Sequence, residues 1–169
     1  MAEFRLTREV ASTADEVWRR VTDWRSHAAQ VPLTRLASVT SGETAVGTVF
    51  VVRSGVGPVG FDDPMEVVRW EPPARDRPGR CRLEKRGRVI TGWAEIEVSP
   101  RGTGAVVVWA EDLRLRPLPR ALDPLVARVG RGVFGRALDG LLRDGAGAAG
   151  TAGTAEARGT GDTGDTPSR

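Results

Sequence analysis

A single histidine limits the chemistry available to this chain. His27 is the only histidine among 169 residues, so a pair of histidine metal ligands is impossible, and the chain has no tyrosine. A Ser-His-Asp triad would have to use His27 beside Ser26, and the sequence contains no nucleophile elbow. No Asp-rich loop with the spacing of cation ligands occurs. We therefore expect a protein without a metal or a cofactor.

Trp24 and His27 are the first candidates for a binding site. They fall where N-terminal helices would meet the open end of a sheet, so both are interpreted as residues at the rim of a cavity. For His27 a second interpretation stays open, an exposed histidine at the end of a helix.

Two charged residues are predicted on an otherwise apolar sheet face. Strict alternation, with Glu66 and Arg114 pointing outward, places Arg69 and Glu111 on the inner faces of their strands. There they could form a buried ion pair, orient a polar group of a ligand, or reach solvent at the strand ends.

Cys81 is the only cysteine, which excludes an internal disulfide and is compatible with a reducing compartment. It alternates with Arg80, Arg82 and Glu84, so its thiol is predicted on the apolar face. This pattern is typical of a buried structural cysteine rather than a nucleophile.

A Gly-x-Gly-x-x-Gly sequence occupies positions 55–60. A dinucleotide site needs a helix directly after such a sequence, but here Phe61-Asp62-Asp63-Pro64 follows. The motif is therefore interpreted as a loop between two strands.

The charge distribution favours a mixed, solvated surface. The chain has 25 basic and 22 acidic residues, with Lys85 as the only lysine. In the basic stretch from Arg75 to Arg88, charges fall on alternate positions at Arg80, Arg82, Glu84 and Arg86, as on the outer face of a strand, so no nucleic-acid partner is expected. No signal peptide and no run of about 18 apolar residues occurs, which predicts a cytoplasmic protein without a membrane span. We expect a monomer or homodimer.

The elements that would position these residues follow a simple order. Thr13 and Glu16 form a capping box before a helix from Asp15 to Trp24, and a shorter helix is predicted from Ser26 to Gln30. A closing helix runs from Pro124 to Arg143, with Asp123 as its cap. Strands are predicted at 3–10, 34–40, 46–54, 60–70, 79–86, 88–99 and 104–116.

This order predicts an α+β fold. Short turns between consecutive strands make antiparallel neighbours, so the sheet should be curved, seven-stranded and antiparallel, with the long C-terminal helix across its concave face and a cavity between them. Residues 1–144 form one domain in this prediction. From Gly145 the composition falls to Gly, Ala, Thr and a few charges, which predicts a disordered tail over 145–169.

Three stretches resemble the START/polyketide cyclase-like superfamily, also called SRPBCC. The likeness rests on residues 10–24, on Val67-Val68-Arg69-Trp70-Glu71-Pro72-Pro73, and on residues 92–113. The resemblance implies a helix-grip fold with the order β-α-α-β6-α. The superfamily includes lipid carriers, plant hormone binders, aromatase/cyclases and quinone-associated proteins. Cyclase members commonly use Arg, Tyr and Ser in the cavity, and Arg69 is the one counterpart here.

The sequence thus favours binding, by sequestration or transport, of a small hydrophobic molecule such as a lipid, quinone or polyketide. The alternative is an aromatase/cyclase in which Arg69, Glu111 or His27 assists proton transfer. A third class is a partner-binding module that uses the tail or the Arg-rich outer face. The predicted cavity residues are Trp24, His27, Phe50, Val52, Met65, Val67, Arg69, Leu83, Ile90, Trp109, Glu111, Leu113, Val129 and Val133.

Overall fold

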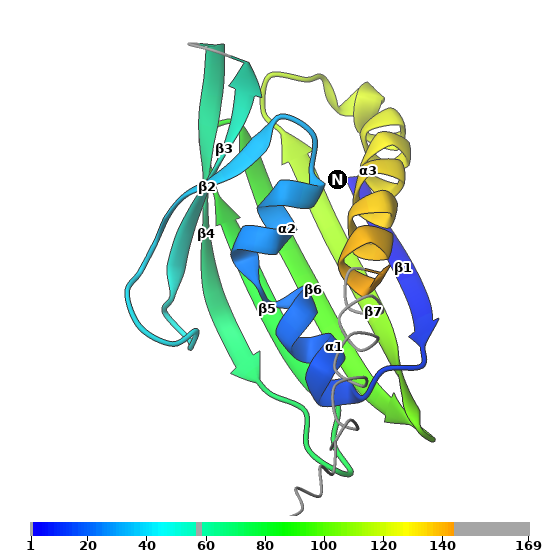
Figure 1. Cartoon of the computed structure of the whole chain (residues 1–169). Coiled ribbons are helices and arrows are strands. Elements are labelled where there is room, and N and C mark those ends of the chain that lie inside the picture. Colours follow the sequence, from blue (N-terminus) through cyan, green and yellow to red (C-terminus); the bar gives the residue numbers. More distant parts are fainter. Residues whose placement is uncertain (1, 57–58, 144–169) are drawn as a thin grey trace, which may run out of the picture.

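A computed structural model describes residues 2–56 and 59–143, which form a seven-stranded antiparallel sheet with its helices (Figure 1). The spatial order of the strands is β1-β7-β6-β5-β4-β3-β2. Their bounds are β1 Ala2–Val10, β2 Thr34–Val39, β3 Val49–Val56, β4 Val59–Glu71, β5 Gly79–Arg86, β6 Ile90–Arg101 and β7 Gly104–Leu115. The predicted antiparallel sheet is confirmed. The predicted tail, 145–169, lies outside the described residues.

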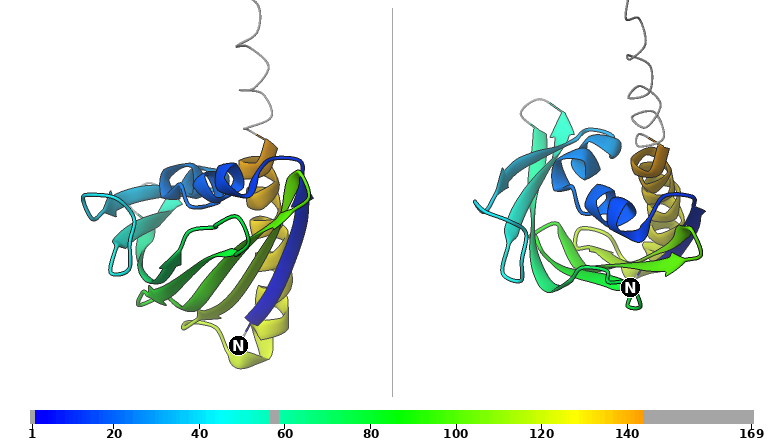
Figure 2. Two further views of the ribbon diagram at one scale, coloured as in Figure 1. Left: turned by 90° about the horizontal axis from the view of Figure 1, so that it is seen from below. Right: turned by 60° about the horizontal axis from the view of Figure 1, so that its bottom comes forward.

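The helices lie on the concave side of the sheet. They are α1 Ala14–Val21, α2 Trp24–Gln30, the short 3-10 helix η1 Arg120–Leu122, and α3 Asp123–Arg143. Figure 2 shows the sheet curling around them, with α3 along the β1 side and α1 and α2 across the opening. The predicted α+β helix-grip architecture is therefore confirmed. None of the helices in the described part of the chain is both long enough and apolar enough to cross a bilayer.

The N-terminal helices divide at Asp23. Thr13 caps α1 as predicted, its side chain accepting a hydrogen bond from the Glu16 amide. The prediction that one helix continues to Trp24 is wrong, because the Asp23 carboxylate accepts from the amides of Arg25 and Ser26 and starts α2 there. Trp24 is consequently the first residue of α2, and its ring stacks on Phe50 at 4.6 Å.

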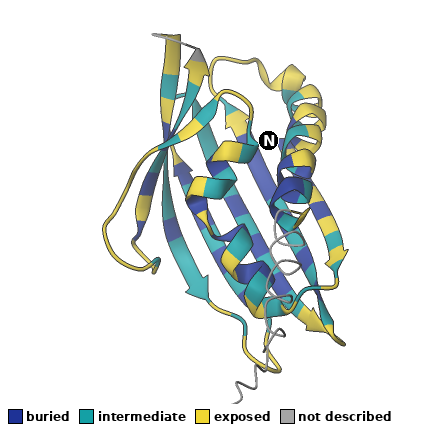
Figure 3. Ribbon diagram, viewed as in Figure 1, coloured by how far each residue is buried: buried dark blue, intermediate teal, exposed yellow. Residues whose placement is uncertain are grey.

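Strict alternation assigns the inner face of most strands correctly. In β6 and β7 the buried positions include Ala94, Ile96, Val107 and Trp109, and Figure 3 shows buried residues along the concave face. Cys81 is 0% exposed, and burial raises the pKa of its thiol to about 12, as expected for a structural cysteine.

A β-bulge in β4 overturns the prediction for Arg69. Val67 pairs with Leu83 on β5, but Arg69 pairs with Arg82, so Val68 is an extra residue without a partner on β5. After the bulge, each residue of β4 faces the side opposite to that predicted by strict alternation. Arg69 lies on the outer face, where Nη2 donates to Glu71 Oε2 at 3.0 Å.

The closing helix begins one residue earlier than predicted, at Asp123 directly after η1, and Asp123 already has helical backbone angles. Gly130 faces Phe4, and a Cβ atom added there would lie 2.8 Å from Phe4 Cε1. The glycine therefore allows α3 to approach β1 closely.

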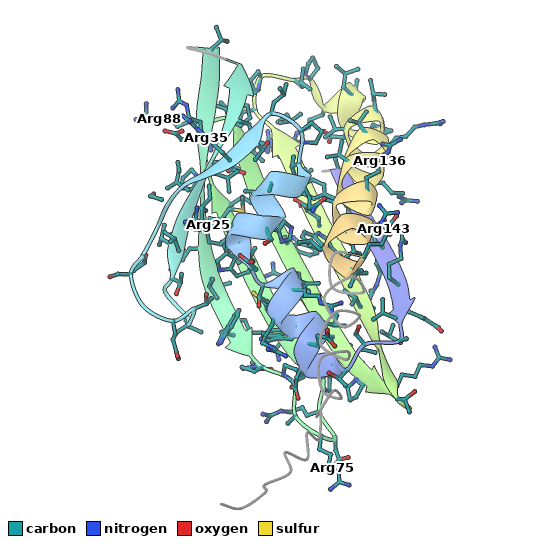
Figure 4. All side chains as sticks on the ribbon, viewed as in Figure 1. Arg25, Arg35, Arg75, Arg88, Arg136 and Arg143 are labelled. Carbon is teal, nitrogen blue, oxygen red and sulfur yellow. The ribbon has the colours of Figure 1, made fainter. Side chains whose placement is uncertain are left out.

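The described residues of the glycine-rich motif at 55–60 belong to two paired strands, and no helix follows the motif. Gly55 pairs with Gly60 in the antiparallel ladder of β3 and β4, and β4 continues as a strand. The labelled arginines in Figure 4 are spread over several parts of the fold: Arg136 and Arg143 project from α3, Arg25 from α2 and Arg35 from β2. This distribution fits the mixed, solvated surface expected from the sequence.

Candidate functional site

A cavity of about 210 Å³ lies between the concave face of the sheet and the helices α2 and α3. Most of its wall is apolar. The lining residues are Trp24, His27, Ala28, Val31, Thr34, Phe50, Val52, Ser54, Asp63, Met65, Leu83, Lys85, Ile90, Ala94, Trp109, Leu113, Val133 and Phe134.

Most of the predicted cavity residues do line this space. They are Trp24, His27, Phe50, Val52, Met65, Leu83, Ile90, Trp109, Leu113 and Val133. Val67 is 0% exposed but belongs to the solid core instead. Val129 is wrongly predicted: the buried arc of α3 runs through Gly130 and Ala137, and Val129, about 100° from Gly130 around the helix, is exposed.

Glu111 belongs to a buried ionic cluster at the cavity wall. Lys85 Nζ lies 3.1 Å from Glu111 Oε1 and 3.9 Å from Asp63 Oδ2, and donates to Met65 Sδ at 3.6 Å. Trp109 Nε1 donates to Glu111 Oε2 at 3.1 Å. The side chains of Asp63, Lys85 and Glu111 are 6%, 5% and 0% exposed. Asp63 and Lys85 line the cavity, and Glu111 lies behind Lys85.

Burial and mutual attraction set the protonation of this cluster. Burial raises the pKa of Asp63 to about 6, with Lys85 opposing the rise and Glu111 adding to it. Burial also raises the pKa of Glu111, against the effect of Lys85 and of the Trp109 hydrogen bond. For Lys85, burial favours the neutral amine, but the carboxylates of Glu111 and Asp63 outweigh it and raise the pKa. Lys85 is therefore an ammonium.

His27 lines the cavity and is not the exposed residue at a helix end that one interpretation allowed. Its ring lies 4.7 Å from that of Trp109, and Nδ1 is 3.3 Å from the Val21 carbonyl oxygen. Because a carbonyl only accepts, Nδ1 carries the proton and Nε2 is left as an acceptor. Burial lowers the pKa of His27 to about 4, with the charge of Lys85 acting in the same direction. The ring is neutral near pH 7.

Sequence analysis missed Lys85 and Asp63 as cavity residues. Lys85 shares the phase of Cys81 and Leu83 on β5, and Asp63 shares the phase of Met65 on β4, so the same alternation that identified Glu111 would have found both. Ala28, Val31, Thr34, Ser54, Ala94 and Phe134 were also missed.

The site combines a mostly apolar wall with a few polar side chains that can bind a polar group of a ligand. Its ammonium can donate to a ligand oxygen, its carboxylates and His27 can accept, and Asp63, with a pKa of about 6, can exchange a proton near neutral pH. In the described ranges, no group of three His, Cys, Asp or Glu side chains is arranged to hold a metal ion.

Comparison with known proteins identifies the family of the chain. A family model described as "Polyketide cyclase / dehydrase and lipid transport" matches residues 1–144. No curated protein matches the chain.

Solved structures share the fold at low sequence identity. A Thermus thermophilus protein, TTHA0849, is 18% identical with a TM-score of 0.65, over 86% of this chain and 98% of that one. The Zhui aromatase/cyclase from Streptomyces sp. R1128 is 18% identical with a TM-score of 0.62, over 90% and 98%. Norcoclaurine synthase from Thalictrum flavum, solved with dopamine and hydroxybenzaldehyde, is 16% identical with a TM-score of 0.56, over 86% of each chain.

Proposed function

The chain belongs to the polyketide cyclase / dehydrase and lipid transport family, and from this premise we propose that it binds a small, largely hydrophobic molecule in the cavity between the sheet and α3. The observation that carries the proposal is the combination of an apolar wall with a buried ionic cluster on one side. Apolar area supplies affinity in such sites, and a few fixed polar groups orient the ligand.

The side chains around the cavity suit a flat or aromatic ligand. Trp109 lies between His27 and Phe134, at 4.7 and 5.9 Å between ring centroids, and Trp24 stacks on Phe50. Aromatic groups of a ligand pack well against such rings in offset or edge-to-face geometry.

Filling the cavity tests this function. Val133 lines it from α3, whereas Val129, one turn earlier, is 56% exposed and does not. We expect Val133→Trp to abolish binding in calorimetric titrations against a panel of lipids, quinones and polyketides, and Val129→Trp to leave it unchanged. Absence of binding by the unaltered protein across the panel, or equal binding by both variants, would contradict the proposal.

A second candidate, cyclisation of a polyketide-type substrate, is favoured by the cluster of Asp63, Lys85 and Glu111. An ammonium beside a carboxylate can stabilise a developing enolate and move a proton. Arg69, the residue first assigned to this role, lies on the outer face and is excluded from it.

The test of catalysis removes both charges of the ion pair together, so that neither remains buried alone. In this candidate, Lys85→Met combined with Glu111→Gln gives a folded protein, by circular dichroism, that forms no cyclised product from a poly-β-keto substrate. Arg69→Ala is the control and keeps full activity. Product formation by the double variant would exclude catalysis by the cluster.

A further inference from the structure

We propose that the ligand of this cavity is an apolar amine whose ammonium group binds Asp63. This inference rests on the proposed binding function and specifies the chemical class of the ligand. The charges, the hydrogen bonds and the neighbours of Asp63 all favour it.

The charges around the polar side of the cavity do not balance. Asp63 and Glu111 are two carboxylates, and Lys85 is the one cation that the described lining residues supply. His27 does not correct the imbalance, because burial lowers its pKa to about 4 and keeps it neutral. A ligand cation would balance the cluster, whereas a ligand carboxylate would bring a third negative charge to a single ammonium.

The carboxylate of Asp63 also lacks hydrogen bonds. Its side chain is 6% exposed, and Oδ1 has no hydrogen-bond partner among the described residues. Lys85 Nζ, at 3.9 Å from Oδ2, is beyond hydrogen-bond distance, lies closer to Glu111 Oε1 at 3.1 Å and donates to Met65 Sδ. A buried carboxylate in this state is stabilised by a donor, and an ammonium gives the strongest such bond.

Asp63 lines the cavity, so a donor on a ligand can approach its carboxylate from there. Its other neighbours supply no donor to Oδ1: Val52, its partner on β3, is apolar, and the β5–β6 turn packs against Oδ1, where a Cβ atom added to Gly87 would lie 2.8 Å away. The charged groups that act on it are Lys85 from β5 and Glu111 from β7, and His27 from α2 lines the same cavity. Both His27 Nε2 and the carboxylates are acceptors, which suits a donor on the ligand.

The experiment compares three ligands of nearly the same shape: 1-naphthylmethylamine, 1-naphthalenemethanol and 1-naphthoic acid. Binding is measured at pH 7.5 by quenching of tryptophan fluorescence, since Trp24 and Trp109 line the cavity, and by calorimetry. We expect the amine to bind at least about tenfold more tightly than the alcohol, and the acid to bind most weakly.

Asp63→Asn removes the carboxylate with little change in shape, and Asp62→Asn is the matched control. Asp62 is the preceding residue and pairs with Arg53 on the outer face at 3.0 Å. We expect Asp63→Asn to weaken the amine about tenfold or more and to leave the alcohol within about twofold, while Asp62→Asn changes neither. In the unaltered protein, amine affinity should also fall as the pH drops below about 6, where Asp63 takes up a proton. Asp63→Asn should lose this pH dependence.

Two results would overturn the inference and leave the binding function intact. One is equal or tighter binding of the alcohol or the acid, and the other is amine affinity that survives Asp63→Asn. Failure of all three ligands, together with failure of the wider panel, would overturn the binding function as well.

Discussion

At the scale of single residues, Asp63 and His27 link stability to pH with opposite signs. The pKa of Asp63 rises to about 6 on folding, so the folded state takes up its proton first, and this contribution is present below pH 4 and lost as the pH rises through 6. The pKa of His27 falls from 6.5 to about 4, so its contribution is present above pH 6.5 and lost as the pH falls through 4. Between these limits the two effects oppose each other.

Single variants should separate them. Relative to the unaltered protein, Asp63→Asn should gain stability as the pH rises from 4 to 7, and His27→Phe should lose it, each by up to about 2–3 kcal/mol at about 1.4 kcal/mol per pKa unit. The measurement is urea unfolding at several pH values. For the double variant Asp63→Asn and His27→Phe, the difference in unfolding free energy from the unaltered protein should vary little with pH. If the unfolding free energies of both single variants ran parallel to that of the unaltered protein across the pH range, the assignment would be contradicted.

The buried ion pair gives a second prediction at this scale. Lys85→Met leaves Glu111 and Asp63 without their cation and should destabilise the protein by about 3–5 kcal/mol. Adding Glu111→Gln should recover part of this loss, because one of the two uncompensated charges disappears and only that of Asp63 remains. Thermal or denaturant unfolding of the unaltered protein, the two single variants and the double variant measures the coupling between Lys85 and Glu111. Strictly additive effects would show that the pair is not coupled.

Residue positions could be predicted wherever alternation is unbroken. Glu111 was assigned inward because its strand alternates without interruption, and Lys85 and Asp63 follow the same rule. Arg69 could not be placed, since a bulge depends on how two strands pair and leaves no mark in the sequence of either one.

At the scale of elements, the ends of the strands could be predicted from the turn residues between them. Gly and Pro between the apolar runs mark nearly every strand end, and β5 begins and ends where predicted. Two N-terminal helices were predicted, but the division between them was placed after Trp24 instead of at Asp23. Asp23 fits the pattern of the first helix, whereas its carboxylate caps α2.

Two glycines of α3, Gly130 and Gly132, differ in what an added methyl group would meet. Gly132→Ala adds a Cβ atom with only Arg136 Nη1 within 4 Å, at 3.7 Å, and should stabilise the helix by about 0.5–1 kcal/mol. Gly130→Ala places the same atom 2.8 Å from Phe4, whose ring stacks on Phe134, and should destabilise by about 1–3 kcal/mol. Both are measured by chemical unfolding, and equal effects at the two positions would contradict the packing described.

At the scale of the whole molecule, the fold could be predicted because the order of elements allows few arrangements. Consecutive strands with short turns form an antiparallel sheet, and one long amphipathic helix must cover it. The volume and the ionic character of the cavity could not be predicted in the same way, since they depend on how side chains from α2, β4, β5, β7 and α3 meet.

Binding should stabilise the whole molecule by mass action. A ligand present at about 100 times its Kd adds about 2.7 kcal/mol, which for a chain of this length corresponds to a rise in Tm of roughly 5–10 °C. Differential scanning fluorimetry with the tightest ligand of the panel measures the shift. Val133→Trp should show none, and an equal shift in that variant would place binding outside the cavity.

The bulge at Val68 determines how the length of β4 can change. Because Arg69 faces outward and Trp70 inward after it, the strand would keep the same interior if Val68 were deleted and alternation became regular. The bulge thus absorbs an inserted residue without exchanging the two faces of β4. Deletion of Val68 should therefore shorten β4 by one residue and keep Val67 and Trp70 on the inner face.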